Sequence, residues 1–351
     1  MNEEVYWVWL TTTLGSSSPA IPKILYKLTP RGAYALSREA LGVLGFEEKI
    51  VDKLSDKSLE RAERIVEKCR EKNIKIVHSE SPEYPTLLHR LKDKPHVIYV
   101  RGDITCLKGR YTSAFIGTRK MSERGREHAE RVANSLINEG YLLVSGIAEG
   151  IDSVAAKVSL SRGEPTVAVL GVDIDKYFPK INEKLIDRVA ETGAVISEYP
   201  PDTNARYFPS RNRIIVGLSH IVNVIEAPVG SGALIAAKLA LKRATPTFAL
   251  NLPGDNFEGC RQLIALGAEE IEGSIASTQE EIKQVKSAEI PDEVQGTRRY
   301  IWEKLLTGEQ SENSLVDAHH PIAEILCALT ELELDGYIKA LPGGKYALKQ
   351  K

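Results

Sequence analysis

The chain has 351 residues, which is too long for one ordinary hydrophobic core and favours two or three domains. Its apolar fraction of 42% and charged fraction of 27% are those of an average globular protein, so the composition excludes extensive disorder. Lys plus Arg number 46 and Asp plus Glu 48, giving a formal charge of -2. Any nucleic-acid site must therefore be a local patch, because a globally basic surface is excluded.

The cysteines and the apolar stretches indicate a protein of the cytoplasm. The four cysteines lie far apart and form no C-x-x-C pair, which excludes a standard zinc module and a disulfide framework. The apolar stretches are short, and the N-terminus lacks a basic region followed by a long apolar run. We therefore predict no signal peptide, no membrane span, and no metal or cofactor.

The first part of the chain has the pattern of a small helical domain, which we place at residues 1–62. Short helices with turns are expected up to about residue 60, and a charged amphipathic helix is expected at 59–72. A short strand at 74–78, a loop with two prolines and a strand at 97–100 follow.

From Ser113 onward the sequence alternates between short apolar runs and segments of helix length. The predicted strands are 113–117, 141–145, 166–171, 194–198, 221–226 and 246–250. The predicted helices include 124–139, 182–191 and 233–243. Near-continuous apolar strands that alternate with helices are typical of an α/β domain, with a mostly parallel sheet covered on both faces. We place this domain at residues 63–275.

Beyond Ala268 the chain becomes acidic, which indicates a terminal segment and then a linker at 276–296. The last part, 297–351, has helix patterns at 300–306 and 321–334. A probable hairpin follows, with strands at 337–341 and 345–348 and a Pro-Gly-Gly turn at 342–344. Helices followed by a two-stranded wing predict a winged-helix domain.

The residues directly after each strand are the candidate binding site, because ligands of open parallel sheets bind outside the carboxyl ends of the strands. A glycine at such a turn lets the backbone approach a phosphate, and an arginine adds a planar donor. The candidates after the first three strands are Gly117, Thr118 and Arg119, then Ser145 and Gly146, then Lys180. The alternative interpretation is a set of tight turns with a solvated arginine and lysine.

The segment 203–225 contains three arginines and no acidic residue. Arg211, Asn212 and Arg213 lead into a helix expected at 214–218, a placement that suits phosphate oxygens. The alternative is internal pairing of these arginines with Glu198 and Glu226.

A further glycine-rich turn, Gly230, Ser231 and Gly232, precedes the helix expected at 233–243. The sequence has no Walker lysine, no H-E-x-x-H and no G-x-S-x-G motif. Glu198 and Glu226 could serve as acid and base, but carboxylates at strand ends also anchor arginines. We therefore predict a binding protein without catalytic residues.

An ordered series of motifs resembles the DprA/Smf family, the DNA-processing proteins of natural transformation. The motifs are Gly117-Thr-Arg119, Ser145-Gly-Ile-Ala-Glu-Gly-Ile-Asp152, Ser197-Glu-Tyr-Pro200, Phe208-Pro-Ser-Arg-Asn-Arg-Ile-Ile215, Glu226-Ala, Ser231-Gly-Ala-Leu-Ile235, Pro253-Gly254 and Leu263-Ile-Ala-Leu-Gly-Ala268. The resemblance covers roughly residues 80–270. It implies a Rossmann-like, doubly wound sheet, and the flanking SAM-like helical domain and winged helix look like extensions that some members carry.

The resemblance also implies a function. Family members bind and protect single-stranded DNA, load a RecA-type recombinase onto it, and commonly form homodimers. Arg119 and Lys180 match basic residues of the family's DNA pocket, and Arg211 with Arg213 match its arginine-asparagine-arginine motif. The chain departs from the family pattern at Ala156, Asp173, Phe178, Ala236 and Arg261. Asp173, together with Asp175, is expected to place negative charge near the site.

Two other functions stay open on the residues alone. The same sheet could belong to a nucleoside-phosphate hydrolase with Glu198 or Glu226 as the base. It could also belong to a nucleotide-sensing regulator whose output is the winged helix. The wing itself carries few basic residues, so duplex binding there is not favoured over a protein contact.

Overall fold

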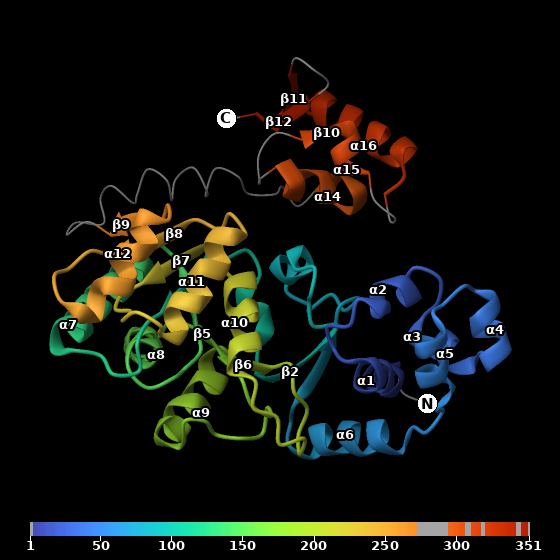
Figure 1. Ribbon diagram of the computed structural model, residues 1–351, viewed down its shortest axis with the longest axis horizontal. Helices are drawn as coiled ribbons and strands as arrows, with labels where there is room; N and C mark the ends of the chain where they lie inside the picture. The colour runs from blue at the N-terminus through green and yellow to red at the C-terminus, as the bar shows by residue number, and fades with distance from the viewer. Residues whose placement is uncertain (1–2, 272–293, 306–309, 317–319, 342–344, 350–351) are drawn as a thin grey trace. The chain divides into compact units, whose positions relative to one another are not determined.

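The structure is a computed structural model that describes residues 3–271, 294–305, 310–316, 320–341 and 345–349 (Figure 1). The chain divides into two units, Met1–Gly273 and Ser274–Lys351. The boundaries that we placed at residues 62, 275 and 296 stay predictions, and most of the predicted linker lies outside the described residues. Among the described helices, none is long and apolar enough to cross a membrane.

A nine-stranded sheet organises the first unit, in the order β1-β2-β6-β5-β4-β3-β7-β8-β9. The six predicted strands are confirmed and are mutually parallel: β3 Thr112–Ile116, β4 Leu142–Ser145, β5 Thr166–Leu170, β6 Ala194–Ser197, β7 Ile221–Val224 and β8 Thr247–Leu250. In register, Ala114 of β3 lies opposite Val144 of β4 and Val222 of β7. The strand order reverses between β3 and β7, which makes this a doubly wound sheet.

Further strands extend the sheet beyond these six at both edges, and the short strand expected at 74–78 is among them. On one side, β1 (Lys75–His78) and β2 (Val97–Gly102) join antiparallel to each other and to β6. On the other side, β9 (Glu269–Ile271) pairs parallel to β8, so the terminal segment expected after Ala268 begins with an edge strand that was not predicted. Its glutamates are exposed, and charged side chains on an edge strand limit pairing with other chains.

Helices cover both faces of the sheet, as predicted. Alternate residues of one strand belong to different cores: Val167 and Val169 pack with α10 and α11, whereas Ala168 and Leu170 pack with α8 and α9. The helices of this part are α7 Glu123–Asn138, α8 Ile151–Ser161, α9 Glu183–Thr192, α10 Phe208–Gly217, α11 Gly232–Lys242 and α12 Glu258–Ala265. Ser122 and Ser231 cap α7 and α11 by accepting the backbone N–H of Gly125 and Leu234.

One helix differs from the expectation in a way that changes the site. α10 begins at Phe208, six residues before the predicted start at Ile214, and Pro209 lies in its first turn. Arg211 and Arg213 are therefore inside the helix and not at its entry, and both are buried.

The N-terminal helices pack on the same core as the sheet. They are α1 Glu3–Leu14, α2 Ala20–Leu25, α3 Pro30–Ala35, α4 Arg38–Val43, α5 Glu48–Ser55 and α6 Glu60–Glu71. Trp7 of α1 is fully buried and stacks on His78 of β1, with ring centroids 4.5 Å apart. Leu10 belongs to the same hydrophobic cluster as Leu170 and Val195 of the sheet. The helices and the sheet thus share apolar contacts.

The second unit contains the winged helix that the sequence predicts. Its elements are α14 Gly296–Leu305, β10 Gln310–Ser311, α15 Glu312–Leu315, α16 Ile322–Leu334, β11 Ile338–Leu341 and β12 Lys345–Leu348. The strands form an antiparallel sheet in the order β10-β12-β11 over a core that includes Ile301, Trp302 and Leu329. The predicted turn at 342–344 lies outside the described residues.

We predict that Trp7→Ala destabilises the whole first unit, since Trp7 joins α1 to β1. Its free energy of unfolding should fall by about 3–5 kcal/mol, as for other buried aromatic truncations. Calorimetry of the full chain would show one shifted transition for residues 1–273 and an unchanged transition for the winged helix. A separate early transition of the N-terminal helices, with the sheet unaffected, would contradict the prediction.

Candidate nucleic-acid interface

The loops that follow the parallel strands are tied to one another at one edge of the sheet. Gly150 has a φ of +80°, and a Cβ atom there would lie 2.3 Å from the carbonyl oxygen of Thr118, so only glycine fits between these loops. The Asn182 side chain donates to the carbonyl of Ile147 at 2.9 Å, and the backbone N–H of Tyr207 donates to Gly171 at 2.8 Å. The loops after β3, β4, β5 and β6 therefore form one continuous surface, which we call the strand-end surface.

Arg119 is the exposed cation at the centre of the strand-end surface. Its guanidinium lies 5.4 Å from the centroid of the Phe208 ring, a cation–π distance. Phe208 in turn lies 4.8 Å from Phe178 and packs against Gly171. Within the described residues Arg119 has no ion pair. Arg119 is thus held beside the ring of Phe208, which is itself supported by Phe178.

Four more cations of this surface are exposed without an ion pair in the described part of the chain: Lys120, Lys176, Lys180 and Arg206. Lys180 was predicted from the sequence, but Lys120, Lys176 and Arg206 were not. A signal for Arg206 was available, since it belongs to the acid-free segment 203–225.

The acidic residues of the loops after β5 and β6 all have partners within the protein. Asp173 is fully buried, and its carboxylate accepts hydrogen bonds from Thr203 N (2.9 Å), Thr203 Oγ1 (2.5 Å), Asn204 N (2.7 Å) and Ala205 N (2.9 Å). Asp175 pairs with Lys72 at 2.6 Å. The negative charge that Asp173 and Asp175 were expected to place near the site is therefore compensated by contacts within the protein.

Two further acids follow β6. Asp202 pairs with Lys68 of α6, and Glu198 pairs with Arg213. The loop after β5 (171–182) contains two acids, Asp173 and Asp175, and the loop after β6 (198–207) contains two, Glu198 and Asp202. All four therefore have partners. The cations consequently dominate the electrostatics of these loops.

Arg211 is buried and bonded within the protein, so it is not exposed to bind a ligand at the surface. Its Nη1 donates to the carbonyl of Val169 at 2.5 Å, and a Cβ atom at Gly146 would lie only 2.1 Å from that nitrogen. Asp152 is buried beside it and accepts the N–H of Gly146 at 3.0 Å. Burial lowers the pKa of Arg211 to about 10, although Asp152 opposes the shift. Burial raises the pKa of Asp152 to about 6, and Arg211 opposes that shift.

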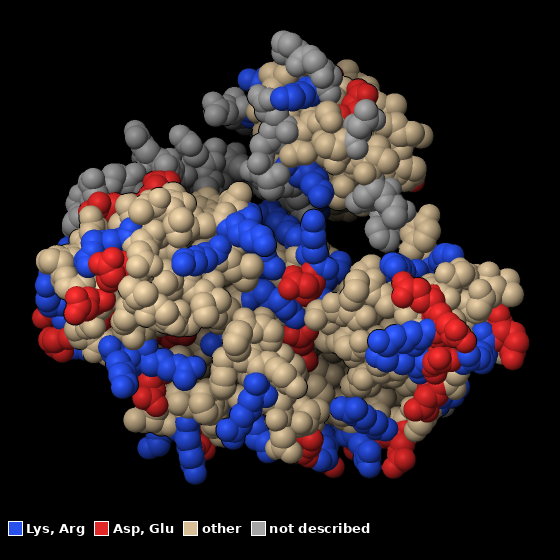
Figure 2. All heavy atoms as spheres, in the orientation of Figure 1, with Lys and Arg blue, Asp and Glu red and all other residues tan. Residues whose placement is uncertain are grey.

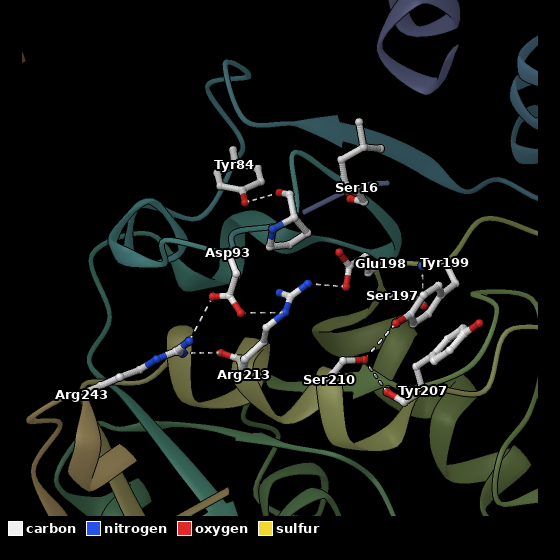
Figure 3. A network of polar contacts seen from close by, with 12 residues as sticks. Ser16, Tyr84, Asp93, Ser197, Glu198, Tyr199, Tyr207, Ser210, Arg213 and Arg243 are labelled. Carbon is white, nitrogen blue, oxygen red and sulfur yellow. Dashed lines mark hydrogen bonds and ion pairs between the residues drawn. The ribbon is translucent and has the colours of Figure 1, made fainter. Parts of the chain in front are cut away.

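Arg213 is buried at the centre of a polar network that extends to the surface at Asp93 (Figure 3). Its Nη2 donates to Glu198 Oε2 at 2.5 Å, and its Nε lies 3.4 Å from Asp93 Oδ2. Arg243 at the end of α11 reaches the other oxygen of Asp93 at 3.1 Å and also donates to the Arg213 carbonyl. Internal pairing with Glu198, the alternative left open by the sequence, is therefore what the structure shows for Arg213.

Glu226 occupies the point where the strand order reverses. It is fully buried, and its two carboxylate oxygens accept the backbone N–H of Ser122 at 3.1 and 3.0 Å, at the amino end of α7. A Cβ atom at Gly125 would lie 1.6 Å from Glu226 Oε2, so the close approach depends on this glycine. In doubly wound folds this helix end commonly binds a nucleotide phosphate. Here a side-chain carboxylate takes that place.

The remaining predicted residues divide by exposure. Gly230 and Gly232 are exposed, Gly117, Asn212 and Ser231 are half-buried, and Thr118, Ser145 and Gly146 are buried. Ser145 donates to the Asp152 carbonyl at 3.2 Å, and the N–H of Thr118 donates to the Glu226 carbonyl at 2.7 Å. These residues shape the loops, whereas Arg119 and Lys180 are the predicted cations that reach solvent.

The fold and this edge define the class: a doubly wound α/β domain with a cationic strand-end surface, followed by a winged helix. Residues 75–283 match the family model of DNA recombination-mediator protein A, and residues 291–344 match that of the DprA winged helix domain. The chain therefore belongs to the DNA recombination-mediator protein A family, DprA/Smf, as the sequence motifs predicted.

Relatives and solved structures agree with this assignment. The chain is 34% identical to Protein Smf of Synechocystis over 284 residues, covering 77% of this chain and 70% of the relative. It is 33% identical to Protein Smf of Escherichia coli over 294 residues, covering 79% and 78%. The crystal structure of DprA from Streptococcus pneumoniae superposes with a TM-score of 0.66 at 27% identity, covering 76% of this chain and 94% of that one.

A second solved structure is that of DprA from Helicobacter pylori, for which a single-stranded DNA binding mode has been described. It superposes with a TM-score of 0.54 at 28% identity and covers 60% of this chain and 96% of that one.

We predict a pH-dependent contribution of Asp152 to stability. Its folded pKa of about 6 is above the ordinary value of 3.8, so the contribution is fully present below the ordinary pKa and is lost as pH rises through about 6. Relative to Asp152→Asn, the wild-type free energy of unfolding should fall by up to about 3 kcal/mol between pH 4 and 7. Denaturant titrations would measure it, with exposed Asp255→Asn as the control, and parallel curves for wild type and Asp152→Asn would contradict it.

Proposed function

We propose that this protein binds single-stranded DNA on the strand-end surface, protects it, and delivers it to a RecA-type recombinase. The observation that carries the DNA-binding proposal is the set of exposed cations, Arg119, Lys120, Lys176, Lys180 and Arg206, whose neighbouring acids are all engaged internally after β5 and β6. In a chain of net charge -2, this local excess supports a polyanionic ligand.

The aromatic rings favour a single strand over a duplex. Phe208 lies beside Arg119 and contacts Phe178. Tyr207 is exposed next to Phe208 and lies 5.3 Å from Tyr199. Unpaired bases stack on such rings, and each stacked base contributes about 1–3 kcal/mol. The bases of a duplex are already stacked and do not offer these faces. The described single-strand binding of the Helicobacter pylori relative supports the same ligand.

The two alternative functions lack a specific observation in their favour. A hydrolase would need a free base, but Glu198 is paired with Arg213, and the two Glu226 oxygens share the backbone N–H of Ser122. A nucleotide sensor would need the amino end of α7, which Glu226 occupies. Helix α16 of the winged helix contains Glu324, Glu331 and Glu333 and no lysine or arginine, so it does not support duplex binding.

Family membership supports the other parts of the proposal. These are protection of the strand, delivery to a recombinase, homodimer formation, a cytoplasmic location and the absence of catalytic turnover. We would test delivery with single strands coated by a single-strand-binding protein, following the ATPase of a RecA-type recombinase. The full chain should shorten the lag before ATPase activity, and a nuclease digest should leave a protected strand.

For DNA binding itself, we predict that Arg119→Gln/Lys180→Gln weakens binding to oligo-dT and lowers its salt dependence. Each lost phosphate contact should reduce the log-log salt slope by about 0.7. Fluorescence anisotropy across a salt series measures both quantities. Arg211 and Arg213 are unsuitable probes, because their removal leaves buried carboxylates without partners.

The matched control is Arg31→Gln/Lys53→Gln, which removes the same two side-chain types from exposed positions on α3 and α5. It should bind like the wild type. If the folded wild-type protein does not bind oligo-dT at low salt, the proposed function is wrong.

We also predict that Glu149→Gln strengthens DNA binding. Glu149 is exposed in the loop after β4, next to Gly150, whose backbone lies against Thr118 and Arg119. Removing its charge takes away a repulsion screened by solvent and salt, so an increase in affinity of about twofold to threefold is expected at low salt. Glu191→Gln, an exposed glutamate near the end of α9, should have no effect, and unchanged affinity of Glu149→Gln would contradict the prediction.

A further inference from the structure

The part of the chain from Thr203 to Gly254 is almost free of acidic residues. Across this span there are six cations and one acid, and that acid, Glu226, is fully buried on the amino end of α7. Helices α10 and α11 both lie within the span, and neither contains a carboxylate. Since the whole chain has a net charge of -2, the cations are concentrated here.

A second group of cations lies where the end of α11 meets the segment 86–94. Figure 2 shows lysine and arginine atoms gathered over this part of the molecule. The Arg243–Asp93 ion pair of 3.1 Å joins the two segments. We call this group the α11 cation cluster, and its members are Arg90, Lys92, Lys94, Lys238, Lys242 and Arg243.

The α11 cation cluster has a surplus of positive charge. Its central acid, Asp93, is already shared between Arg213 and Arg243. Lys92, Lys238 and Lys242 are exposed, and none of them has an ion pair within the described ranges. Lys238 and Lys242 are one turn apart, so they lie on the same face of α11.

The lysines of the cluster lie in the second half of α11, away from the helix start at the carboxyl edge of the sheet. Both α10 and α11 begin at the carboxyl edge of the sheet, and the eleven residues of α11 rise about 16 Å. Between the two ends, α11 exposes Ile235 and no charged residue before Lys238. A polyanion leaving Arg119 could therefore follow α11 without meeting an acidic side chain of either helix.

We propose that the α11 cation cluster is a second phosphate-binding area, which holds the continuation of a single strand already bound at the strand-end surface. The proposal rests on the proposed function, because the strand must first be bound at the strand-end surface. The cluster would add contacts to the phosphate backbone of the DNA, without the aromatic rings found at the strand-end surface. A short oligonucleotide occupies the strand-end surface alone, whereas a longer one also reaches Lys238 and Lys242. The cluster thus makes affinity depend on strand length.

The test compares Lys238→Gln/Lys242→Gln with the wild-type full chain on oligo-dT of about 6 and about 30 nucleotides, across a salt series. With the long strand, the double variant should bind about tenfold more weakly, the scale of two exposed ion contacts. Its salt slope should fall by about 1.4, or 0.7 for each phosphate. With the short strand, variant and wild type should bind alike.

The matched control is Lys49→Gln/Lys53→Gln, two exposed lysines with the same spacing on α5, which should match the wild type at both lengths. Equal binding of Lys238→Gln/Lys242→Gln and wild type to the long strand would overturn the inference while leaving the proposed function intact. An equal loss at both lengths would also overturn it, because the cluster would then belong to the minimal site. Failure of the wild type to bind either strand would overturn both proposals.

Discussion

The buried ion pair between Arg213 and Glu198 is the interaction on which the binding edge depends. Arg213 comes from α10, Glu198 from the end of β6, and Asp93 and Arg243 extend the pair to the segment 86–94 and to α11. Removing one partner of a buried pair typically costs about 3–5 kcal/mol, because the other charge is left without compensation. Four segments distant in sequence are thereby fixed together, and α10 in turn positions Phe208 beneath Arg119.

This arrangement divides the charged residues of the domain into two roles. Arg211 and Arg213 are buried and form hydrogen bonds within the protein. The acidic residues around them accept hydrogen bonds from backbone N–H groups, as Asp173 does, or form ion pairs. The side chains left in solvent are mainly basic, on the strand-end loops and along α11. A protein with a slightly negative net charge can in this way present a cationic surface, since electrostatic attraction depends on the local distribution of charge.

The sequence predicted the six parallel strands because each is buried on both faces and is therefore a continuous apolar run. It placed the start of α10 too late, although proline in a first helical turn, here Pro209, is a known signal of a helix start. Because of that error Arg211 and Arg213 were placed on the surface. The pairing of Arg213 with Asp93 could not be predicted, since no local pattern connects residues so far apart. Edge strand β9 was missed because Glu269 and Glu270 interrupt its apolar pattern.

Glu226 has a consequence for which ligands can compete for this protein. Its carboxylate is attached to the same chain as the α7 amino end, so its effective concentration there is at least about millimolar, without any cost of association. A free mononucleotide would have to displace it to bind in the manner usual for this kind of sheet. The surface that remains offers separate cations at several loops, and a ligand gains from these only when it carries many phosphates. If the strand-end surface binds DNA as proposed, the occupied helix end favours ligands that carry many phosphates over free mononucleotides.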